Sequence, residues 1–410
     1  MTRVLLFTGK GGVGKTTLAA ATAAQLAADG RKALVVSTDP AHSLGDALGV
    51  PLDGRPSEVD SGLFAAQIDP RDLVDHAWHD LRGHLRTILA GAGVDELDAE
   101  ELTVLPGVEE LLALAEVHRL AHAGPWEAVV VDCGPTAETL RLLSLPEAFA
   151  GYLERLFPTH RRVVRGLLAG VAGTATVETW DATADALGRL AEHLDALRAM
   201  LTDQTSTSVR LVLTPERVVA AETRRTLTAL ALRGIRVDGV IANRLVPDAG
   251  AEFGESAAWL RTRRAEQDAV LADLRRSAEL TGVGEGAMRV VDHRAAEPVG
   301  VPALLDVAAQ LYEGADPLSG VESSAAPMLE VTGGGRGAEA EYTLRIALPL
   351  GDDTALDLAR VGDELAVTVD GRRRLVALPP LLRRCVVTGA EMDETGLAVS
   401  FRPDPNLWMR

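Results

Sequence analysis

Hydrophobic positions in the first 313 residues follow two alternating patterns. Short apolar runs rich in β-branched side chains are typical of strands buried on both faces. These runs occupy residues 3–8, 32–38, 127–132, 209–214 and 237–243. The stretch between the first two runs, 16–29, is rich in Ala and has no Gly or Pro, which predicts a helix that Gly30 terminates. A strand, a helix and a second strand form a βαβ unit with parallel strands.

A leucine stripe later in the chain predicts another helix with one core-facing side. Its members step by three and four: Leu187, Leu190, Leu194, Leu197 and Leu201. Strands and helices that alternate from residue 1 to about 313 favour an α/β fold with a doubly wound, mostly parallel sheet. We assign residues 1–313 to this domain.

The pattern changes after residue 313. Residues 314–326 are rich in Ser, Gly, Pro and Ala and are typical of a linker. Residues 327–405 contain short β-rich runs, and the Asp370-Gly371 pair between two of them predicts a hairpin. We therefore expect a small all-β sandwich. Its predicted strands are 341–350, 356–360, 364–369, 373–378, 385–388 and 397–401.

A glycine-rich motif joins the first predicted strand to the first predicted helix. Residues 9–16 read GKGGVGKT and match the phosphate-binding loop pattern of nucleotide-binding proteins, a deviant Walker A motif. The loop backbone is expected to bind ATP phosphates, with Lys15 on the β- and γ-phosphates and the Thr16 hydroxyl on Mg²⁺. The loop residues that would surround the phosphates are Gly9, Gly11, Gly12, Val13 and Gly14.

Lys10 adds a second cation to this loop. It stands at a position from which the side chain points outward, so two interpretations stay open. Lys10 is either a solvated lysine or a catalytic cation that serves the site of a facing subunit, like an arginine finger.

Charge and cysteine content exclude several classes of protein. The chain has 41 Lys and Arg against 59 Asp and Glu, a net charge of −18, which argues against nucleic acid as a partner. Cys133 and Cys385 could form one disulfide at most, so we expect a reduced cytoplasmic protein. We expect neither a signal peptide nor an integral membrane segment, because no apolar run is long enough for either.

Three segments together resemble the ArsA-type ATPases. They are KGGVGKTT in the loop, STDPAHSLGDALG at 37–49 and VVVDCGPTAETLRLLSLPE at 129–147. That family includes the arsenite-pump ATPase and the eukaryotic ATPases that target tail-anchored membrane proteins. The resemblance implies ATP hydrolysis with Mg²⁺ by a homodimer that binds nucleotide at the subunit interface.

The same resemblance assigns roles to single residues. Asp39 matches the switch I aspartate that polarises the attacking water, and Asp132 matches the Walker B carboxylate that holds Mg²⁺. Pro135 and Thr136 fall in switch II, where the family senses the γ-phosphate. Thr17 matches a contact to the α-phosphate.

Two further residues are assigned to the adenine base by resemblance. Asn243 ends a predicted strand and matches an adenine-reading asparagine, although a strand-end turn residue is the alternative. Pro298 lies in a segment that resembles the second adenine loop.

The chain also departs from the family. The stretch after Asn243 lacks the C-x-x-C pair that binds zinc between subunits, so we expect no zinc. The thiol cluster of an arsenite site is missing too, because As(III) prefers several thiolates.

Residues 146–204 occupy the place of the family's client-binding helices. They contain many apolar side chains, so a hydrophobic groove and ordinary packing both stay open. Residues 327–405 resemble the α-crystallin domain of small heat-shock proteins, on the segments 342–350, 364–379 and 395–403. We therefore expect a nucleotide-switched homodimer that binds or targets a hydrophobic client, a protein or a lipid. The alternative is the energy-coupling ATPase subunit of an anion or arsenite export system.

Overall fold

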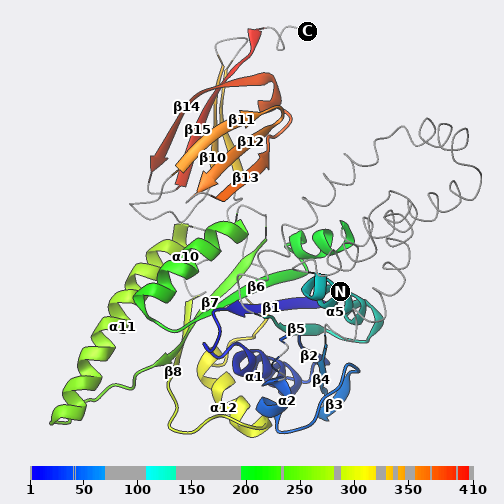
Figure 1. Ribbon diagram of the computed structural model, residues 1–410, viewed down its shortest axis with the longest axis vertical. Helices are drawn as coiled ribbons and strands as arrows, with labels where there is room; N and C mark the ends of the chain where they lie inside the picture. The colour runs from blue at the N-terminus through cyan, green and yellow to red at the C-terminus, as the bar shows by residue number, and fades with distance from the viewer. Residues whose placement is uncertain are drawn as a thin grey trace, which may run out of the picture. The chain divides into compact units, whose positions relative to one another are not determined.

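The computed structural model of the chain describes residues 2–39, 41, 43–69, 108–134, 195–231, 235–280, 288–319, 329–335, 340–346, 356–369, 372–393 and 396–405. Strands and helices alternate in these stretches as far as Tyr312, and strands predominate beyond it (Figure 1). Pro135, Thr136 and most of the expected client region, 146–204, lie outside the described residues.

Eight strands form the large sheet, in the order β3-β4-β2-β5-β1-β6-β7-β8. Adjacent strands are parallel in five pairs, β4–β2, β2–β5, β5–β1, β6–β7 and β7–β8, and antiparallel in the edge pair β3–β4. The prediction of a mostly parallel α/β sheet is therefore confirmed. The strands are Arg3–Gly9 (β1), Ala33–Ser37 (β2), Ser57–Asp60 (β3), Leu63–Gln67 (β4), Ala128–Asp132 (β5), Thr207–Leu213 (β6), Val237–Leu245 (β7) and Met288–Asp292 (β8).

The helices cover the strands of this sheet. The Ala-rich helix α1 packs against β1, β2 and β5, while α10 and α11 pack against each other and against β7. No helix in the described stretches is long and apolar enough to cross a bilayer. The helices are Lys15–Ala28 (α1), Ser43–Leu48 (α2), Val108–Ala123 (α5), Arg217–Ala231 (α10), Glu255–Leu280 (α11) and Val301–Tyr312 (α12).

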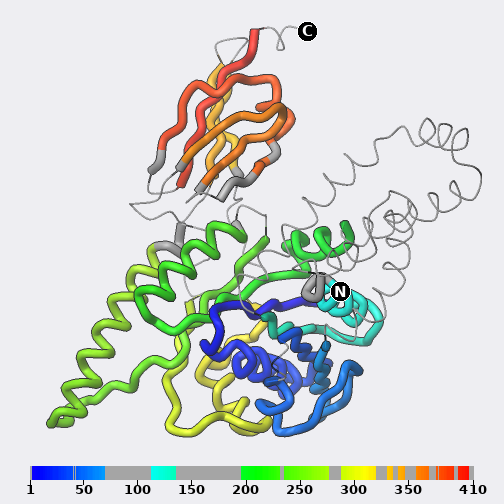
Figure 2. Tube along the Cα trace, in the orientation of Figure 1, coloured from blue at the N-terminus to red at the C-terminus, as the bar shows by residue number. Residues whose placement is uncertain are grey.

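The chain, which Figure 2 traces from blue to red, divides into two compact units. The first comprises residues 1–207 and 297–309, and the second comprises residues 208–296 and 310–410. In the first unit, β2 and β5 are buried along their whole length. This two-sided burial explains why their sequences are continuous apolar runs rather than alternating ones. Leu197 and Leu201 of the predicted leucine stripe are also buried, on a helical stretch.

A buried ion pair is the main polar feature of the second unit. Arg210 of β6 lies between Asp238 of β7, at 3.1 Å, and the hydroxyl of Tyr312, at 2.8 Å. Its guanidinium also donates to the carbonyl of Pro317, and Ser208 donates to Asp238 at 2.9 Å. Burial alone would lower the pKa of Arg210, but Asp238 and Tyr312 raise it above its ordinary value, so the guanidinium stays charged.

The C-terminal strands form a sandwich of two antiparallel sheets, ordered β14-β15-β10-β9 and β11-β12-β13. Their core includes Leu344, Leu365, Val399 and Phe401, all buried. In the β12–β13 pair, Val369 lies opposite Arg372, as a two-residue hairpin connection requires. The predictions of the sandwich and of this hairpin are confirmed. The strands are Leu329–Gly334 (β9), Glu341–Ile346 (β10), Leu356–Val361 (β11), Glu364–Val369 (β12), Arg372–Ala377 (β13), Cys385–Asp393 (β14) and Gly396–Pro403 (β15), with a 3-10 helix at Leu382–Arg384.

Candidate nucleotide site

The glycine-rich loop connects β1 to α1 at the carboxyl edge of the sheet. Gly12 and Gly14 have φ values of 79° and 94°, in the left-handed region that favours glycine. Gly14 is the N-cap of α1 and supplies no side-chain hydrogen bond, and the first turn carries no acidic residue. The amide groups at this helix end are therefore open to an anion, and the helix dipole favours one there.

The two lysines of the loop have different environments. Lys15 is only 5% exposed, and its ammonium donates to the carbonyl of Lys10 at 3.4 Å. Lys10 is exposed at the loop surface. The geometry therefore holds the cation of Lys15 against the loop and leaves that of Lys10 in solvent.

Three hydroxyl side chains and one carboxylate meet beside the loop. Thr16 donates to Oδ2 of Asp132 at 2.8 Å, and its Oγ1 lies 3.0 Å from Oγ of Ser43. Ser37 donates to the same Oδ2 of Asp132 at 3.0 Å. They converge because β2, β5 and β1 are neighbours, with Ser37 and Phe7 opposite Asp132 in the register.

Asp132 is a completely buried carboxylate. Burial raises its pKa to about 6, although hydrogen bonds from Thr16 and Ser37 and the charge of Lys15 oppose the rise. Its second oxygen, Oδ1, has no hydrogen-bond partner within the described stretches. A buried, unpaired carboxylate oxygen beside a threonine hydroxyl is a donor set that suits Mg²⁺.

Asp39 lies just beyond the end of β2, half-buried. Its carboxylate Oδ1 accepts a hydrogen bond from the amide of Ala41 at 3.0 Å. Its backbone amide donates to Ser37, and its backbone carbonyl accepts from Gln67 of β4. Thr17, the next loop position after Thr16, is half-buried in the first turn of α1.

The second unit holds Asn243, which the sequence assigned to adenine. Asn243 is 9% exposed near the end of β7, and its Oδ1 accepts the amide of Arg244 at 2.9 Å. Arg244 has a φ of 60°, a strained value for a residue other than glycine. Gln267 of α11 supports this turn, since it donates to the carbonyl of Arg244 at 3.3 Å and accepts the amide of Val246 at 2.8 Å.

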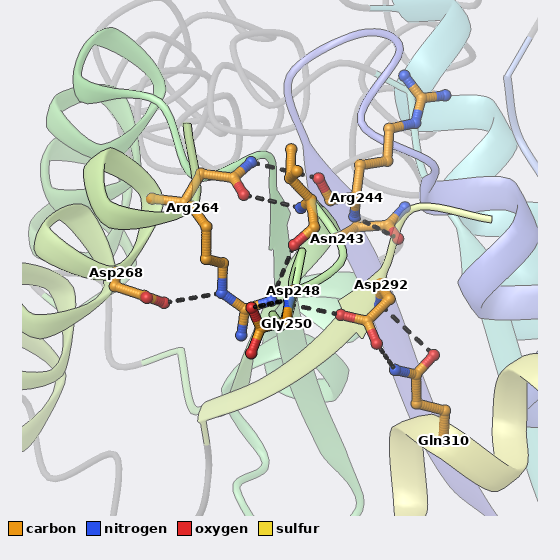
Figure 3. A network of polar contacts seen from close by, with 10 residues as sticks. Asn243, Arg244, Asp248, Gly250, Arg264, Asp268, Asp292 and Gln310 are labelled. Carbon is orange, nitrogen blue, oxygen red and sulfur yellow. Dashed lines mark hydrogen bonds and ion pairs between the residues drawn. The ribbon is translucent and has the colours of Figure 1, made fainter. Parts of the chain in front are cut away.

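Arg264 of α11 extends the same network, as Figure 3 shows. It donates to the carbonyl of Val246 at 2.9 Å and to Asp268 at 3.2 Å, and it lies 3.8 Å from Asp292 of β8. Gln310 donates to Asp292 at 2.8 Å. These bonds fix the carboxyl ends of β7 and β8 relative to each other.

An open pocket of about 620 Å³ lies at these strand ends, within the second unit. It is lined by Thr214, Glu216, Arg244, Val246, Trp259, Thr262, Arg263, Glu266, Gln267 and His293. Doubly wound sheets bind ligands outside the carboxyl ends of their strands, so the pocket is well placed for one. Pro298, the other residue assigned to adenine, lies half-buried in the first unit.

Fold and loop together define a P-loop nucleotide-binding protein. The family model described as anion-transporting ATPase matches residues 2–313, and the chain belongs to this family. A second model, described as the HSP20-like domain found in ArsA, matches residues 339–401. The resemblances to ArsA-type ATPases and to the small heat-shock protein domain are thus confirmed.

Several curated proteins are similar over most of the chain. Protein Rv2184c of Mycobacterium tuberculosis is 40% identical over 427 aligned residues, which cover 99% of this chain and 97% of that protein. A putative arsenical pump-driving ATPase of Chlorobaculum tepidum is 32% identical, covering 97% and 96%. ATPase GET3C of Arabidopsis thaliana is 29% identical, covering 73% of this chain and 79% of that protein.

The structure brings Lys15, Thr16, Asp132 and Asp39 together in the first unit. Three further contributors, Ser37, Ser43 and Gln67, were missed by the sequence reasoning. Ser37 and Ser43 were visible as polar residues flanking DPAH. Gln67 gave no signal, because it ends an apolar run that was not identified as a strand.

Proposed function

We propose that the chain hydrolyses ATP with Mg²⁺, as a nucleotide-switched homodimer that binds a hydrophobic client. The observation that carries the hydrolysis is the meeting of Thr16 and Asp132 beside a loop that holds Lys15, with Asp39 at the end of the adjacent strand. Phosphoryl transfer depends on positioning and charge compensation, and these residue types supply both.

Each group of the chain at this site has a separate role in the proposed hydrolysis. The amides of the loop and of the α1 N-terminus bind phosphate oxygens, and Lys15 adds a full positive charge. Thr16 and Asp132 would hold Mg²⁺, which supplies positive charge to the phosphates when bound. Asp39 orients the attacking water and accepts its proton.

The test is phosphate release by the purified full-length chain, measured with Mg²⁺ and with the metal chelated. We expect turnover only with Mg²⁺ and a loss of at least about 10²-fold in Asp39→Asn, which still binds MgATP. Absence of hydrolysis in the wild type over a range of nucleotide concentrations would refute the assignment.

The HSP20-like domain supports the part of the proposal that concerns a hydrophobic client. Relatives of the chain are named ATPase GET3C and ATPase GET3B, and the chain carries an HSP20-like domain after its ATPase domain. To test it, the Asp39→Asn chain is loaded with MgATP and offered an apolar peptide of about 20 residues. Binding that needs MgATP supports the client, and binding equal to that of a polar peptide of the same length counts against it.

Arsenite export is the second candidate, because close relatives are named putative arsenical pump-driving ATPases. The two thiols of the chain weaken it. Cys133 and Cys385 are both buried and free, and burial raises the pKa of Cys133 to about 12 and raises that of Cys385. As(III) prefers thiolates, and neither residue supplies one at neutral pH.

A further inference from the structure

The backbone N–H and C=O of Asp39 are each bonded by a buried side chain, and the two side chains come from different strands. Its amide donates to Oγ of Ser37 at 3.2 Å, and its carbonyl accepts from Nε2 of Gln67 at 3.0 Å. Ser37 is fully buried and Gln67 is 4% exposed. Both residues end their strands, and they lie opposite each other in the β2–β4 register.

Ser37 also connects Asp39 to Asp132. A serine hydroxyl has one proton, which Ser37 gives to Oδ2 of Asp132 at 3.0 Å while its lone pair accepts the amide of Asp39. Ser37 lies opposite Asp132 in the β2–β5 register, so the connection spans neighbouring strands. One hydroxyl therefore ties the loop of the candidate water-orienting carboxylate to the candidate metal carboxylate.

A purely structural role does not explain Gln67, because its side chain lowers the stability of the fold. Its Oε1 is buried and has no hydrogen-bond partner among the residues that the structure describes. A buried polar atom without a partner destabilises the fold, and an apolar side chain at this strand end would avoid that cost. What the amide contributes in return is the donor that fixes the Asp39 carbonyl.

We propose that Ser37 and Gln67 are positioning residues that hold Asp39 in register with Asp132 for hydrolysis. This inference rests on the proposed ATPase function. The two side chains bond the N–H and the C=O of residue 39, so they restrict the backbone that carries its carboxylate. Positioning errors of about 1 Å can cost up to about 10²-fold in rate, so loss of either bond should lower kcat.

Variants of the two residues distinguish the loss of the bond to Asp39 from the loss of the bond to Asp132. Ser37→Ala removes the bonds to both Asp39 and Asp132. Gln67→Glu replaces the donor with an acceptor next to the Asp39 carbonyl and leaves the bonds of Asp132 intact. Ser37→Thr keeps the hydroxyl and serves as the conservative rescue. Thr22→Ala is the matched control, because it removes a buried hydroxyl of α1 that donates to the carbonyl of Leu18 at 2.7 Å.

The experiment measures kcat and KM for MgATP, together with amide hydrogen exchange of the peptide 37–43 in nucleotide-free protein. We expect Ser37→Ala and Gln67→Glu to lower kcat about 10- to 100-fold with KM changed by less than about 3-fold. Exchange in the peptide should accelerate in both. Ser37→Thr should recover most of kcat, and Thr22→Ala should change neither measurement.

Three results would overturn the inference. They are unchanged exchange in both variants, full kcat despite faster exchange, and a loss of kcat in Thr22→Ala as large as in Ser37→Ala. If Ser37→Ala does not fold, Gln67→Glu decides alone. A wild-type chain that does not hydrolyse ATP would refute the proposed function, whereas the exchange measurement still decides whether Ser37 and Gln67 hold residue 39.

Discussion

Replacing Asp132 with Asn should make the metal-free protein more stable and at the same time abolish hydrolysis. Asp132 is fully buried, and among the described residues its charge is compensated by the hydroxyls of Thr16 and Ser37 and by nearby Lys15. Asn has nearly the same shape, can accept both hydroxyl bonds and carries no charge. The substitution therefore removes a buried charge without opening a cavity.

The magnitude follows from the pKa of Asp132, which burial raises from 3.8 to about 6. At 1.36 kcal/mol for each pKa unit, this difference corresponds to roughly 3 kcal/mol. Because the folded-state pKa lies above the unfolded value, the neutral carboxyl stabilises the fold below pH 3.8, and that stability is lost as the pH rises through about 6. At pH 8 the wild type carries the whole cost of the charge and Asp132→Asn carries none.

The assay is urea unfolding of both chains without nucleotide or Mg²⁺, at pH 8 and near pH 4. We expect Asp132→Asn to be more stable by up to about 3 kcal/mol at pH 8, with the difference shrinking toward pH 4. MgATP at about 1,000 times its Kd should reverse the order, since it stabilises the wild type by about 4.1 kcal/mol, more than the difference without ligand. Asp39→Asn, at a half-buried carboxylate, is the control. A variant less stable than wild type at pH 8 would show that the buried charge of Asp132 is compensated without metal.

Four further outcomes are expected. Lys15→Ala should abolish tight MgATP binding, and unchanged affinity by calorimetry would contradict the phosphate-loop assignment. Lys10→Ala and Asp39→Asn should each be inactive, yet mixing them should restore up to half the wild-type activity per mixed dimer if Lys10 acts across the interface. No recovery after proven subunit exchange would mean that Lys10 acts in its own site or that the two sites cannot hydrolyse ATP separately. Arsenite or antimonite should not raise the hydrolysis rate, and a several-fold rise would support export. Asp238→Ala should cost about 3–5 kcal/mol in urea unfolding, because it leaves the guanidinium of Arg210 buried without its carboxylate; a loss under about 1 kcal/mol would argue against that account.

The sequence predicted strands that are continuous, β-branched apolar runs and missed others, β3 and β4 among them. β1, β2 and β5 matched expectation to within one residue at each end, because each is a continuous buried run. β3 was missed because it lies at the edge of the sheet and only Val59 is partly buried. β4 was missed although it is buried, since its short run LFAAQ is rich in Ala, which has a low strand propensity.

Some residues of the candidate site could likewise be predicted from the sequence and others could not. Lys15, Thr16 and Asp132 were predictable because each belongs to a motif whose spacing is set by a strand, a loop and a helix. Ser37 and Gln67 were not, because their roles depend on register between strands that are distant in sequence. The ion pair of Arg210 and Asp238 was hidden for the same reason, since an arginine within an apolar run reveals nothing about its partner.

Because its two cysteines are buried, the native chain is suited to site-directed labelling at an introduced cysteine. Cys133 and Cys385 are 3% and 1% exposed, and the raised pKa of each keeps its thiol protonated. Thiol reagents act on the thiolate, so both residues should react slowly while the protein is folded. A single cysteine introduced at Val218, which is 71% exposed on α10, would then carry a fluorophore or spin label almost alone. Motions driven by nucleotide could be followed in a protein that keeps both of its own cysteines.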